Sequence, residues 1–317
     1  MLDALKFVQG SVAKKELVEG LTSFLIRDGQ VQGFNGVIAL GSPIELDIDC
    51  KPEAGPMIKA ISNCDETVQL TMMANGKLNI KSGPFRVAIR CIDKETPHVF
   101  PEGDLYEIDG ARFVHGVKSV APFVGSDASR PWSCGILINN GSLFATNNVT
   151  IAEYWFGNQF PIDCIIPSVA IKEILRIKAN PTHIQVSKNN VTFHYPEGRW
   201  LRTQLIDAEW PDIRRILNVQ CNAHPVDPGL FEGLHKIKPF AEDRPRVYIE
   251  NGLARTHYDD AEGASFVLQD RTITGVYNID ILLLLENVVK TADFSLYPQP
   301  CAFFGENLRG VLIGERV

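Results

Sequence analysis

Two hydrophobic periods alternate along the chain. Apolar residues recur at intervals of three and four in six stretches, as Leu5, Val8 and Val12 do in the first, which is the pattern of amphipathic helices. Between them, apolar and polar positions alternate over 68–72, 191–195 and 200–205, which is typical of half-buried strands. The six predicted helices span residues 2–15, 54–62, 111–121, 168–178, 229–238 and 279–290. The order helix, strands, helix, strands occurs three times and predicts an α+β fold.

A hairpin signal returns at nearly constant intervals. Asp-Gly or Asn-Gly follows a short apolar stretch at 28–29, 140–141 and 251–252, at intervals of 112 and 111 residues. Glycine adopts positive φ at little cost, so these dipeptides favour tight hairpin turns. Two Ile-Asp pairs also repeat with an offset of 114 residues, 48–49 with 162–163 and 92–93 with 206–207. We therefore predict three tandem domains, 1–103, 104–218 and 219–317, with boundaries in turn-rich segments.

Composition narrows the class of protein. The 317 residues carry a net charge of −7 and 45% apolar residues, which excludes a disordered or collagen-like chain. The longest apolar run, 281–285, is far shorter than the roughly 20 residues of a membrane span, and no signal-peptide core precedes the first predicted helix. We expect a cytoplasmic protein with no membrane partner. Seven cysteines, none spaced as Cys-x-x-Cys, favour reduced thiols packed as small apolar side chains.

Positive charge is concentrated on the predicted helices. Their 67 residues hold 12 Lys and Arg against 5 Asp and Glu, a net +7, so the other 250 residues carry −14. Lys172 and Arg176 lie one turn apart, and Arg112, His115 and Lys118 recur every third residue. A plain solvated helix face explains one such helix. Several helices with the same bias favour contact with nucleic-acid phosphates, which is independent of base sequence and weakened by salt.

Signatures of catalysis do not occur in the sequence. There is no phosphate-binding loop, dinucleotide fingerprint, nucleophile elbow or zinc-binding helix motif, and no two of the seven histidines have metal-ligand spacing. His194 falls in an alternating strand, where a surface histidine is the simpler interpretation. The repeated aspartates, Asp49 with Asp163 and Asp93 with Asp207, favour turn or cap roles, because an acid–base pair is needed only once. We expect no enzyme activity, cofactor or metal; an α+β hydrolase without a recognisable motif is the alternative.

One segment carries a family resemblance. Residues 206–217, Ile-Asp-Ala-Glu-Trp-Pro-Asp-Ile-Arg-Arg-Ile-Leu, resemble the end of the second domain of bacterial β sliding clamps, the processivity subunit of DNA polymerase III, where Phe-Pro-Asp-Tyr-Arg-Arg is typical. Residues 166–176 are similar to the start of that domain's second helix, 130–137 to its first strand, and 276–285 to the matching helix of the third domain. The resemblance covers most of 104–317; over the first unit the repeat offset carries the inference.

The resemblance implies a fold and an assembly. Three clamp domains, each with two helices backed by antiparallel sheets, form a ring as a head-to-tail homodimer, with the helices around double-stranded DNA. The ring tethers a DNA polymerase, and a clamp loader opens it. A scaffold of the same fold that never encloses DNA is the alternative, and the sequence leaves open whether two or three chains close the ring. The implied DNA contacts are Lys6, Lys14, Lys15, Lys59, Arg112, Lys118, Lys172, Arg176, Lys236 and Lys238.

The family also has a hydrophobic cleft that receives a short peptide from the polymerase and from clamp-loader subunits. The matching positions here are Thr146, Ile151, Pro211, Arg215, Ile216, Ile313 and Arg316. Core packing is the alternative role for Ile151 and Ile216. Two segments depart from the family: 146–152 reads Thr-Asn-Asn-Val-Thr-Ile-Ala instead of Thr-Asp-Gly-x-Arg-Leu-Ala, and 314–317 reads Gly-Glu-Arg-Val instead of Met-Pro-Met-Arg. These departures leave the partner motif that the cleft receives open, and the short first unit indicates a divergent clamp of phage or prophage type.

Overall fold

A computed structural model describes residues 1–15, 18–65, 67–157, 160, 163–212, 214–242, 244–258 and 263–316. Ile162, Ile213 and Val317, which belong to the repeat and the motifs above, lie outside the described residues. The chain divides into two compact units. The first contains 1–114 and 169–205, and the second contains 115–168 and 206–317. The second predicted domain contributes to both units, and the division into three domains at 103 and 218 stays a prediction.

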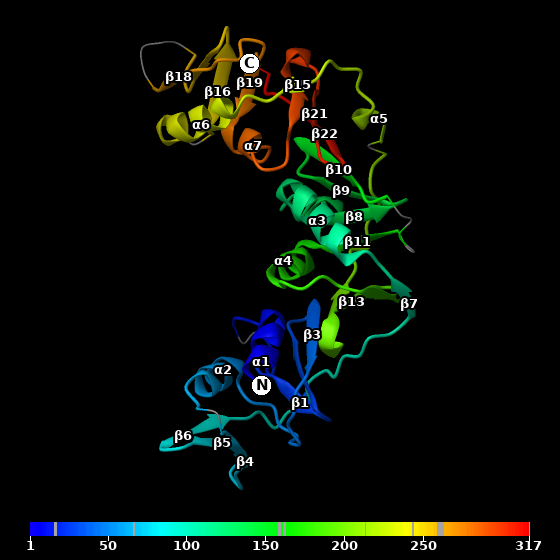
Figure 1. The fold of residues 1–317 in the computed structure, drawn as a ribbon, viewed down its shortest axis with the longest axis vertical. Coiled ribbons are helices and arrows are strands. Elements are labelled where there is room, and N and C mark those ends of the chain that lie inside the picture. The colour runs from blue at the N-terminus through cyan, green and yellow to red at the C-terminus, as the bar shows by residue number, and fades with distance from the viewer. Residues whose placement is uncertain are drawn as a thin grey trace. The chain divides into compact units, whose positions relative to one another are not determined.

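The first unit is built on two antiparallel sheets (Figure 1). The seven-stranded sheet has the order β1 (Leu25–Arg27), β2 (Gln30–Phe34), β3 (Ile38–Pro43), β14 (Trp200–Gln204), β13 (Asn190–His194), β12 (His183–Val186), β7 (Asp104–Glu107). The three-stranded sheet has the order β4 (Gln69–Met72), β5 (Lys77–Ser82), β6 (Phe85–Arg90). The helices are α1 (Leu2–Val8), α2 (Ala54–Ser62) and α4 (Ser168–Arg176), with 3₁₀ turns at Gln9–Ser11 and Pro196–Gly198.

The second unit also combines helices with two antiparallel sheets. Its eight-stranded sheet has the order β11 (Cys164–Pro167), β8 (Gly135–Asn139), β9 (Ser142–Thr146), β10 (Thr150–Trp155), β22 (Leu308–Leu312), β21 (Cys301–Gly305), β20 (Thr291–Asp293), β15 (His224–Pro225). The four-stranded sheet has the order β18 (Ser265–Val267), β17 (Leu253–Arg255), β16 (Arg246–Glu250), β19 (Gly275–Asn278). The helices are α5 (Arg214–Leu217), α6 (Pro228–Ile237) and α7 (Ile279–Leu283), and α3 (Gly110–Val120) runs from the first unit into the second; the 3₁₀ turns are Ala121–Phe123, Pro131–Cys134, Lys238–Phe240 and Phe294–Leu296.

The three predicted hairpins are confirmed. They join β1 to β2, β8 to β9 and β16 to β17. Both turn residues of each hairpin have positive φ, between 46° and 80°, which is the requirement of a type I′ turn. The repeated aspartates support two of these hairpins: Asp49 accepts from Arg27 Nε at 2.8 Å, and Asp163 accepts from Asn139 Nδ2 at 2.7 Å. Both donors directly precede their turns, so Asp49 and Asp163 have equivalent structural roles.

The larger sheet of each unit crosses a predicted domain boundary. In the first unit β3 pairs with β14, and the ring of Trp200 lies over Gly41, where an added Cβ would be 2.2 Å from it. In the second unit β10 pairs with β22 over five residue pairs. The helices bury their apolar faces against these sheets; Leu5, Val8 and Ile174 are all fully buried. Each such side chain contributes roughly 1.5–3 kcal/mol of transfer free energy.

Two predicted helices are too long. The first ends at Val8 and continues only as a 3₁₀ turn to Ser11, instead of reaching residue 15. Ser11 Oγ donates to Val8 O at 2.9 Å and accepts from Leu40 N at 3.2 Å, so a contact with β3 replaces the next helical turn. Lys14 and Lys15 therefore lie beyond the helix. The last helix ends at Leu283 rather than at 290, because the chain turns so that Lys290 N donates to Phe304 O.

The described residues include every cysteine of the chain. All seven cysteines are free thiols, as predicted. In the described ranges, no helix has the length and apolar content to cross a membrane, and no three His, Cys, Asp or Glu side chains are grouped in a way that could hold a metal ion.

The burial of His194 predicts a pH dependence of stability. His194 Nε2 lies 3.0 Å from Gln185 Oε1, and burial, with the nearby His183 charge, lowers the pKa of His194. In the unfolded chain the histidine pKa is about 6.5, so as the pH falls the unfolded chain binds a proton at a higher pH than the folded chain does. The contribution of neutral His194 to the free energy of unfolding is therefore fully present above that pH and is lost as the pH falls below it. We expect His194→Gln to reduce the loss of urea stability between pH 7.5 and 5.5. An unchanged loss in the variant would show that His194 is not its source.

Candidate functional site

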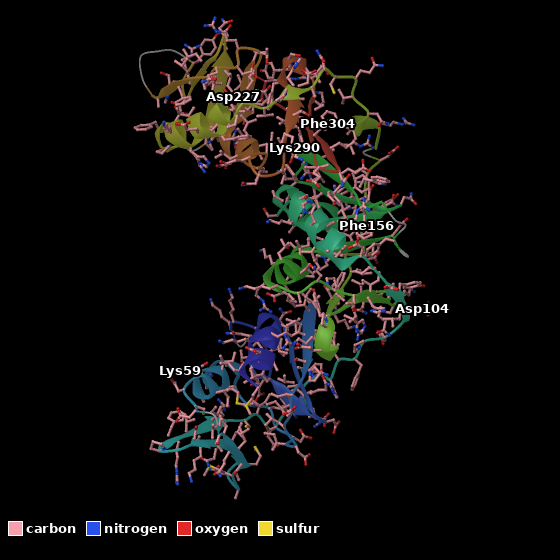
Figure 2. All side chains as sticks on the ribbon, viewed as in Figure 1. Lys59, Asp104, Phe156, Asp227, Lys290 and Phe304 are labelled. Atoms are coloured by element: carbon pink, nitrogen blue, oxygen red, sulfur yellow. The ribbon has the colours of Figure 1, made fainter. Side chains whose placement is uncertain are left out.

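Three helices of the first unit present unpaired cations. Lys6 on α1, Lys59 on α2 and Lys172 on α4 are exposed, and among the described residues none of the three makes an ion pair. Each lies on the side of its helix away from the buried apolar residues, and Figure 2 shows Lys59 projecting from α2. These ammonium groups can contact an anion without the loss of an ion pair to a carboxylate of the same chain.

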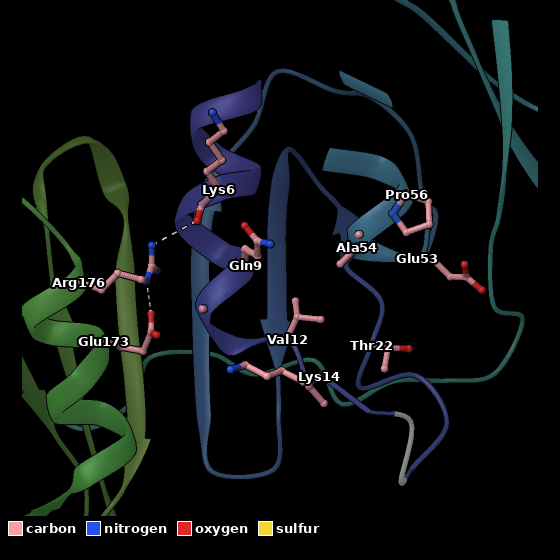
Figure 3. A pocket seen from close by; sticks show the side chains of 13 residues that line it. Lys6, Gln9, Val12, Lys14, Thr22, Glu53, Ala54, Pro56, Glu173 and Arg176 are labelled. Carbon is pink, nitrogen blue, oxygen red and sulfur yellow. Dashed lines mark hydrogen bonds and ion pairs between the residues drawn. The ribbon is translucent and has the colours of Figure 1, made fainter. Parts of the chain in front are cut away.

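A cavity of about 530 Å³, lined by both charged and apolar residues, lies between the helices of this unit (Figure 3). Its lining combines α1 and the following residues with the start of α2 and the end of α4. Lys6 and Lys14 contribute ammonium groups, whereas Glu173 and Arg176 are paired with each other at 2.6 Å. Lys14 and Lys15 are exposed although they follow the helix. The lining of the cavity is therefore net positive, and its contact with DNA stays a prediction.

Arg176 has a positioning role that the sequence did not indicate. Its Nη2 donates to Phe7 O at 2.7 Å and its Nη1 to Lys6 O at 3.4 Å, while Nε donates to Glu173 Oε2. These carbonyls belong to the last turn of α1, where a cation also interacts favourably with the helix dipole. Arg176 thus fastens α4 to the end of α1. The contact of Arg176 with DNA stays a prediction, and these hydrogen bonds leave fewer of its N–H groups for a phosphate.

The remaining predicted cations differ in their surroundings. Lys118 on α3 is exposed and makes no ion pair among the described residues, and Arg112 on the same helix is half-buried. Lys236 pairs with Glu232 at 2.6 Å, and Lys238 pairs with Asp280 at 2.6 Å. Both pairs are exposed, so they add little to stability, but they neutralise the two cations that the third predicted domain supplies.

The predicted peptide cleft lies in the second unit and begins at the β9–β10 turn. Thr146 is buried; its Oγ1 donates to Thr150 O at 2.7 Å and accepts from Asn148 N at 3.1 Å. Thr146 therefore braces the turn. Ile151 pairs across the sheet with Thr146 on one side and with Val311 on the other. Although residues 146–152 depart from the family motif, the β9–β10 turn is closed by these hydrogen bonds.

Two exposed apolar side chains are neighbours in sequence of a small buried cluster in this region. Phe144, Leu217 and Val311 form the cluster, and Leu137, Ile151, Trp210 and Val219 pack against it. Ile216, next to Leu217 on α5, is 41% exposed, and Ile313, two residues after Val311, is 47% exposed. Core packing is therefore excluded for Ile216, whereas Ile151 packs partly into the core.

The other predicted cleft residues are solvent-exposed. Pro211 and Arg316 are exposed, and Arg215, whose Nε lies 3.8 Å from Asp212 Oδ2, is almost fully so. An apolar patch with charged side chains at its rim is a surface on which a partner side chain can be desolvated.

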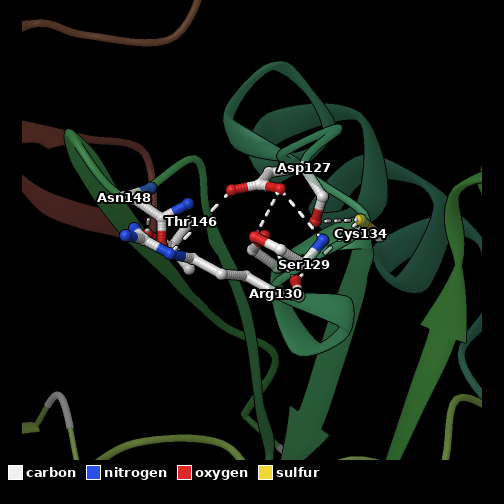
Figure 4. Close-up of polar contacts among 7 residues, drawn as sticks. Asp127, Ser129, Arg130, Cys134, Thr146 and Asn148 are labelled. Carbon is white, nitrogen blue, oxygen red and sulfur yellow. Dashed lines mark hydrogen bonds and ion pairs between the residues drawn. The ribbon is translucent and has the colours of Figure 1, made fainter.

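Sequence reasoning missed Arg130 as a residue of this region. Gly125 N donates to both Ser133 O and Thr146 O, which holds the segment after Arg130 against the β9–β10 turn. The Arg130 Nε lies 3.9 Å from Asp127 Oδ2, and Figure 4 shows this side chain extending toward Thr146. Hydrogen bonds from Ser129 lower the pKa of Asp127, so it stays ionised beside the half-exposed guanidinium. The repeated Arg-Pro dipeptide, at 130–131 and 244–245, was the available signal.

Comparisons with known proteins identify the fold. No protein-family model and no curated protein sequence matches the chain. Among solved structures, the DNA polymerase III β subunit of Pseudomonas aeruginosa matches with a TM-score of 0.83 and 17% identity, over 100% of this chain and 97% of that one. A sliding clamp from Bartonella birtlesii bound to griselimycin (0.84, 16%) and the β subunit from Streptococcus pyogenes (0.82, 15%) match over the same shares. The chain has the fold of these β subunits, which confirms the resemblance and extends it through residues 1–103.

Proposed function

We propose that this chain is a DNA sliding clamp: a ring that encloses duplex DNA, tethers a DNA polymerase and catalyses no reaction itself. The observation that carries the proposal is the agreement of the whole chain with the β-subunit fold at a TM-score of about 0.83. The unpaired lysines on α1, α2, α3 and α4 support it, because a ring of this kind needs cations on its helices. Enclosure removes the need for tight binding, so sequence-independent phosphate contacts are sufficient.

Ring closure by a head-to-tail homodimer has two supporting features. β6 and β18 each end a sheet in the described part of the chain, so both have an edge for pairing with another strand, although Arg90 O at the end of β6 accepts from Glu53 N. Residues 67–91 contain four Lys or Arg and no Asp or Glu, and residues 256–270 contain four Asp or Glu and no Lys or Arg. On β5 and β6, Lys81 faces Arg86 and Lys77 faces Arg90 directly. Such like-charge pairs are unfavourable alone and favour an anionic partner surface.

Charge reversal at this edge tests ring closure. We expect Arg86→Glu to raise the dissociation constant of the homodimer by at least about tenfold at low salt, because it adds repulsion to the acidic partner surface. Light scattering against concentration reads this as a shift from twice 35.2 kDa toward 35.2 kDa. Lys188→Glu, an exposed position elsewhere, is the matched control. An unchanged dimer in Arg86→Glu would remove this edge from the interface, and three times the chain mass would replace the dimer by a trimer.

The apolar patch around Ile216 and Ile313 is the proposed peptide site. Neighbours of this fold from two bacteria are described as bound to griselimycin, so the fold accommodates a ligand of that kind. A partner tail with an aliphatic or aromatic anchor would fill the patch, and a few buried contacts would dominate the affinity. The polymerase and clamp-loader subunits are the proposed partners. Because the sequence has no phosphate-binding loop, the loader would supply the nucleotide hydrolysis that opens the ring.

A further inference from the structure

A second apolar groove lies on the same face of the eight-stranded sheet as the proposed peptide site. Ile151, Glu153 and Trp155 alternate along β10, so all three side chains point to one face. The groove has a volume of about 330 Å³ and is lined by Trp155 together with Phe304 and Leu308. It belongs wholly to the second unit. Phe304, on β21, is marked in Figure 2.

Internal contacts fix the walls and the floor of this groove. Trp155 N donates to Asn307 O at 2.8 Å, which holds the end of β10 against the β21–β22 turn. Phe304 and Glu153 both face Arg309 across the sheet. Arg309 Nε donates to Glu153 Oε2 at 2.6 Å, and Arg309 Nη1 donates to Asn218 Oδ1 at 3.2 Å. The two charged side chains of the floor are therefore paired with each other, and the aromatic and aliphatic side chains of the lining offer apolar contact to a ligand.

Exposure and spacing indicate what the groove receives. Trp155 is 56% exposed, although a large aromatic side chain normally buries most of its surface, and tryptophan is enriched at the energetic centres of interfaces. Ile151, at the proposed peptide site, lies four residues earlier on the same strand and the same face. That separation is about 13 Å, which four or five residues of extended chain can cover.

We propose that Trp155 and Phe304 form a second docking point for the partner tail that is anchored at Ile216 and Ile313. The occupant is an aromatic or aliphatic side chain on the same extended segment, four or five residues from the anchor, and the intervening residues are uncharged because the floor is neutral. This inference rests on the proposed function. Two contacts on one tail bind more tightly than either alone, since the second forms within the complex.

The experiment compares two ligands that differ in length. Griselimycin tests the peptide site alone, and the replicative DNA polymerase encoded by the same genome tests both docking points. We expect Trp155→Ala to weaken polymerase binding by at least about tenfold and to leave griselimycin binding unchanged. Phe304→Ala is expected to act in the same direction. Phe240→Ala, which removes an aromatic side chain that is 62% exposed in the same unit, is the matched control and is expected to change neither affinity.

Three outcomes would overturn the inference. Equal polymerase affinity for Trp155→Ala and for the unmodified chain would remove the groove from the interface while leaving the peptide site intact. A loss of self-association in Trp155→Ala, with polymerase affinity unchanged, would assign the groove to a second copy of the chain. If neither ligand binds the unmodified chain, the peptide site itself fails, and the groove has no tail to receive. Thermal melting of each variant separates these results from misfolding.

Discussion

Ile216→Asp is expected to weaken polymerase binding by at least about a hundredfold. Ile216 is exposed in the free chain, so the aspartate costs little in folding. In the complex, an anchor side chain of the partner would cover the new carboxylate beside the cluster of Phe144, Leu217 and Val311. Removing an unpaired carboxylate from water costs several kcal/mol, and about 2.7 kcal/mol already corresponds to a hundredfold change in affinity. Calorimetric titration with the polymerase measures the change.

A control variant distinguishes this effect from general surface disturbance. Val37→Asp introduces the same carboxylate at an apolar side chain of similar exposure, 39%, in the other unit. We expect Val37→Asp to bind the polymerase as the unmodified chain does. Polymerase affinity of Ile216→Asp within threefold of the control would place the peptide site elsewhere.

The second large effect is expected from the unpaired lysines. The triple variant Lys6→Glu, Lys118→Glu, Lys172→Glu replaces one unpaired cation on each of three helices. If each contacts one phosphate, a homodimeric ring loses six contacts, and the slope of log affinity against log salt falls by about five, at roughly 0.9 for each contact. Fluorescence anisotropy of labelled duplex DNA over a salt series measures the slope.

The paired lysines provide the control for that experiment. Lys236→Glu with Lys238→Glu also reverses cations, but Glu232 and Asp280 already neutralise both positions. A smaller loss of affinity per substitution is therefore expected. If the double variant weakens DNA binding more than the triple variant does, the third predicted domain makes the main DNA contacts, and the lysines on α1, α3 and α4 do not.

Local features of the fold were predictable from the sequence. The three hairpins depend on turn dipeptides that themselves require positive φ, and α2 matches the predicted 54–62 at both ends. The helix at the N-terminus was predicted too long because its end depends on Ser11, whose hydroxyl accepts from Leu40 N, 29 residues away. No periodicity over residues 2–15 contains that contact. A tertiary contact therefore sets the end of this helix.

The resemblance selected residues for the candidate site but not the state of each side chain. It named Ile216 and Ile313, both of which are exposed in the folded chain, and their role as a peptide site stays a prediction. It could not reveal that the guanidinium of Arg176 is engaged by carbonyls 169 and 170 residues away, or that Arg309 neutralises Glu153 across a sheet. Such pairings depend on strand order and register. The sequence did not indicate that Trp155 is exposed, because the exposure of a strand residue depends on what packs against the folded sheet.

Topological retention on DNA tests the central claim most directly. The chain is assembled on a nicked circular duplex, isolated by gel filtration, and the circle is then cut once. We predict that the protein elutes with the circle, leaves after the cut, and stays when both new ends are blocked by bound protein. Equal retention on circular and on open linear DNA, or no retention on either, would contradict a sliding ring and leave a binding scaffold with the clamp fold.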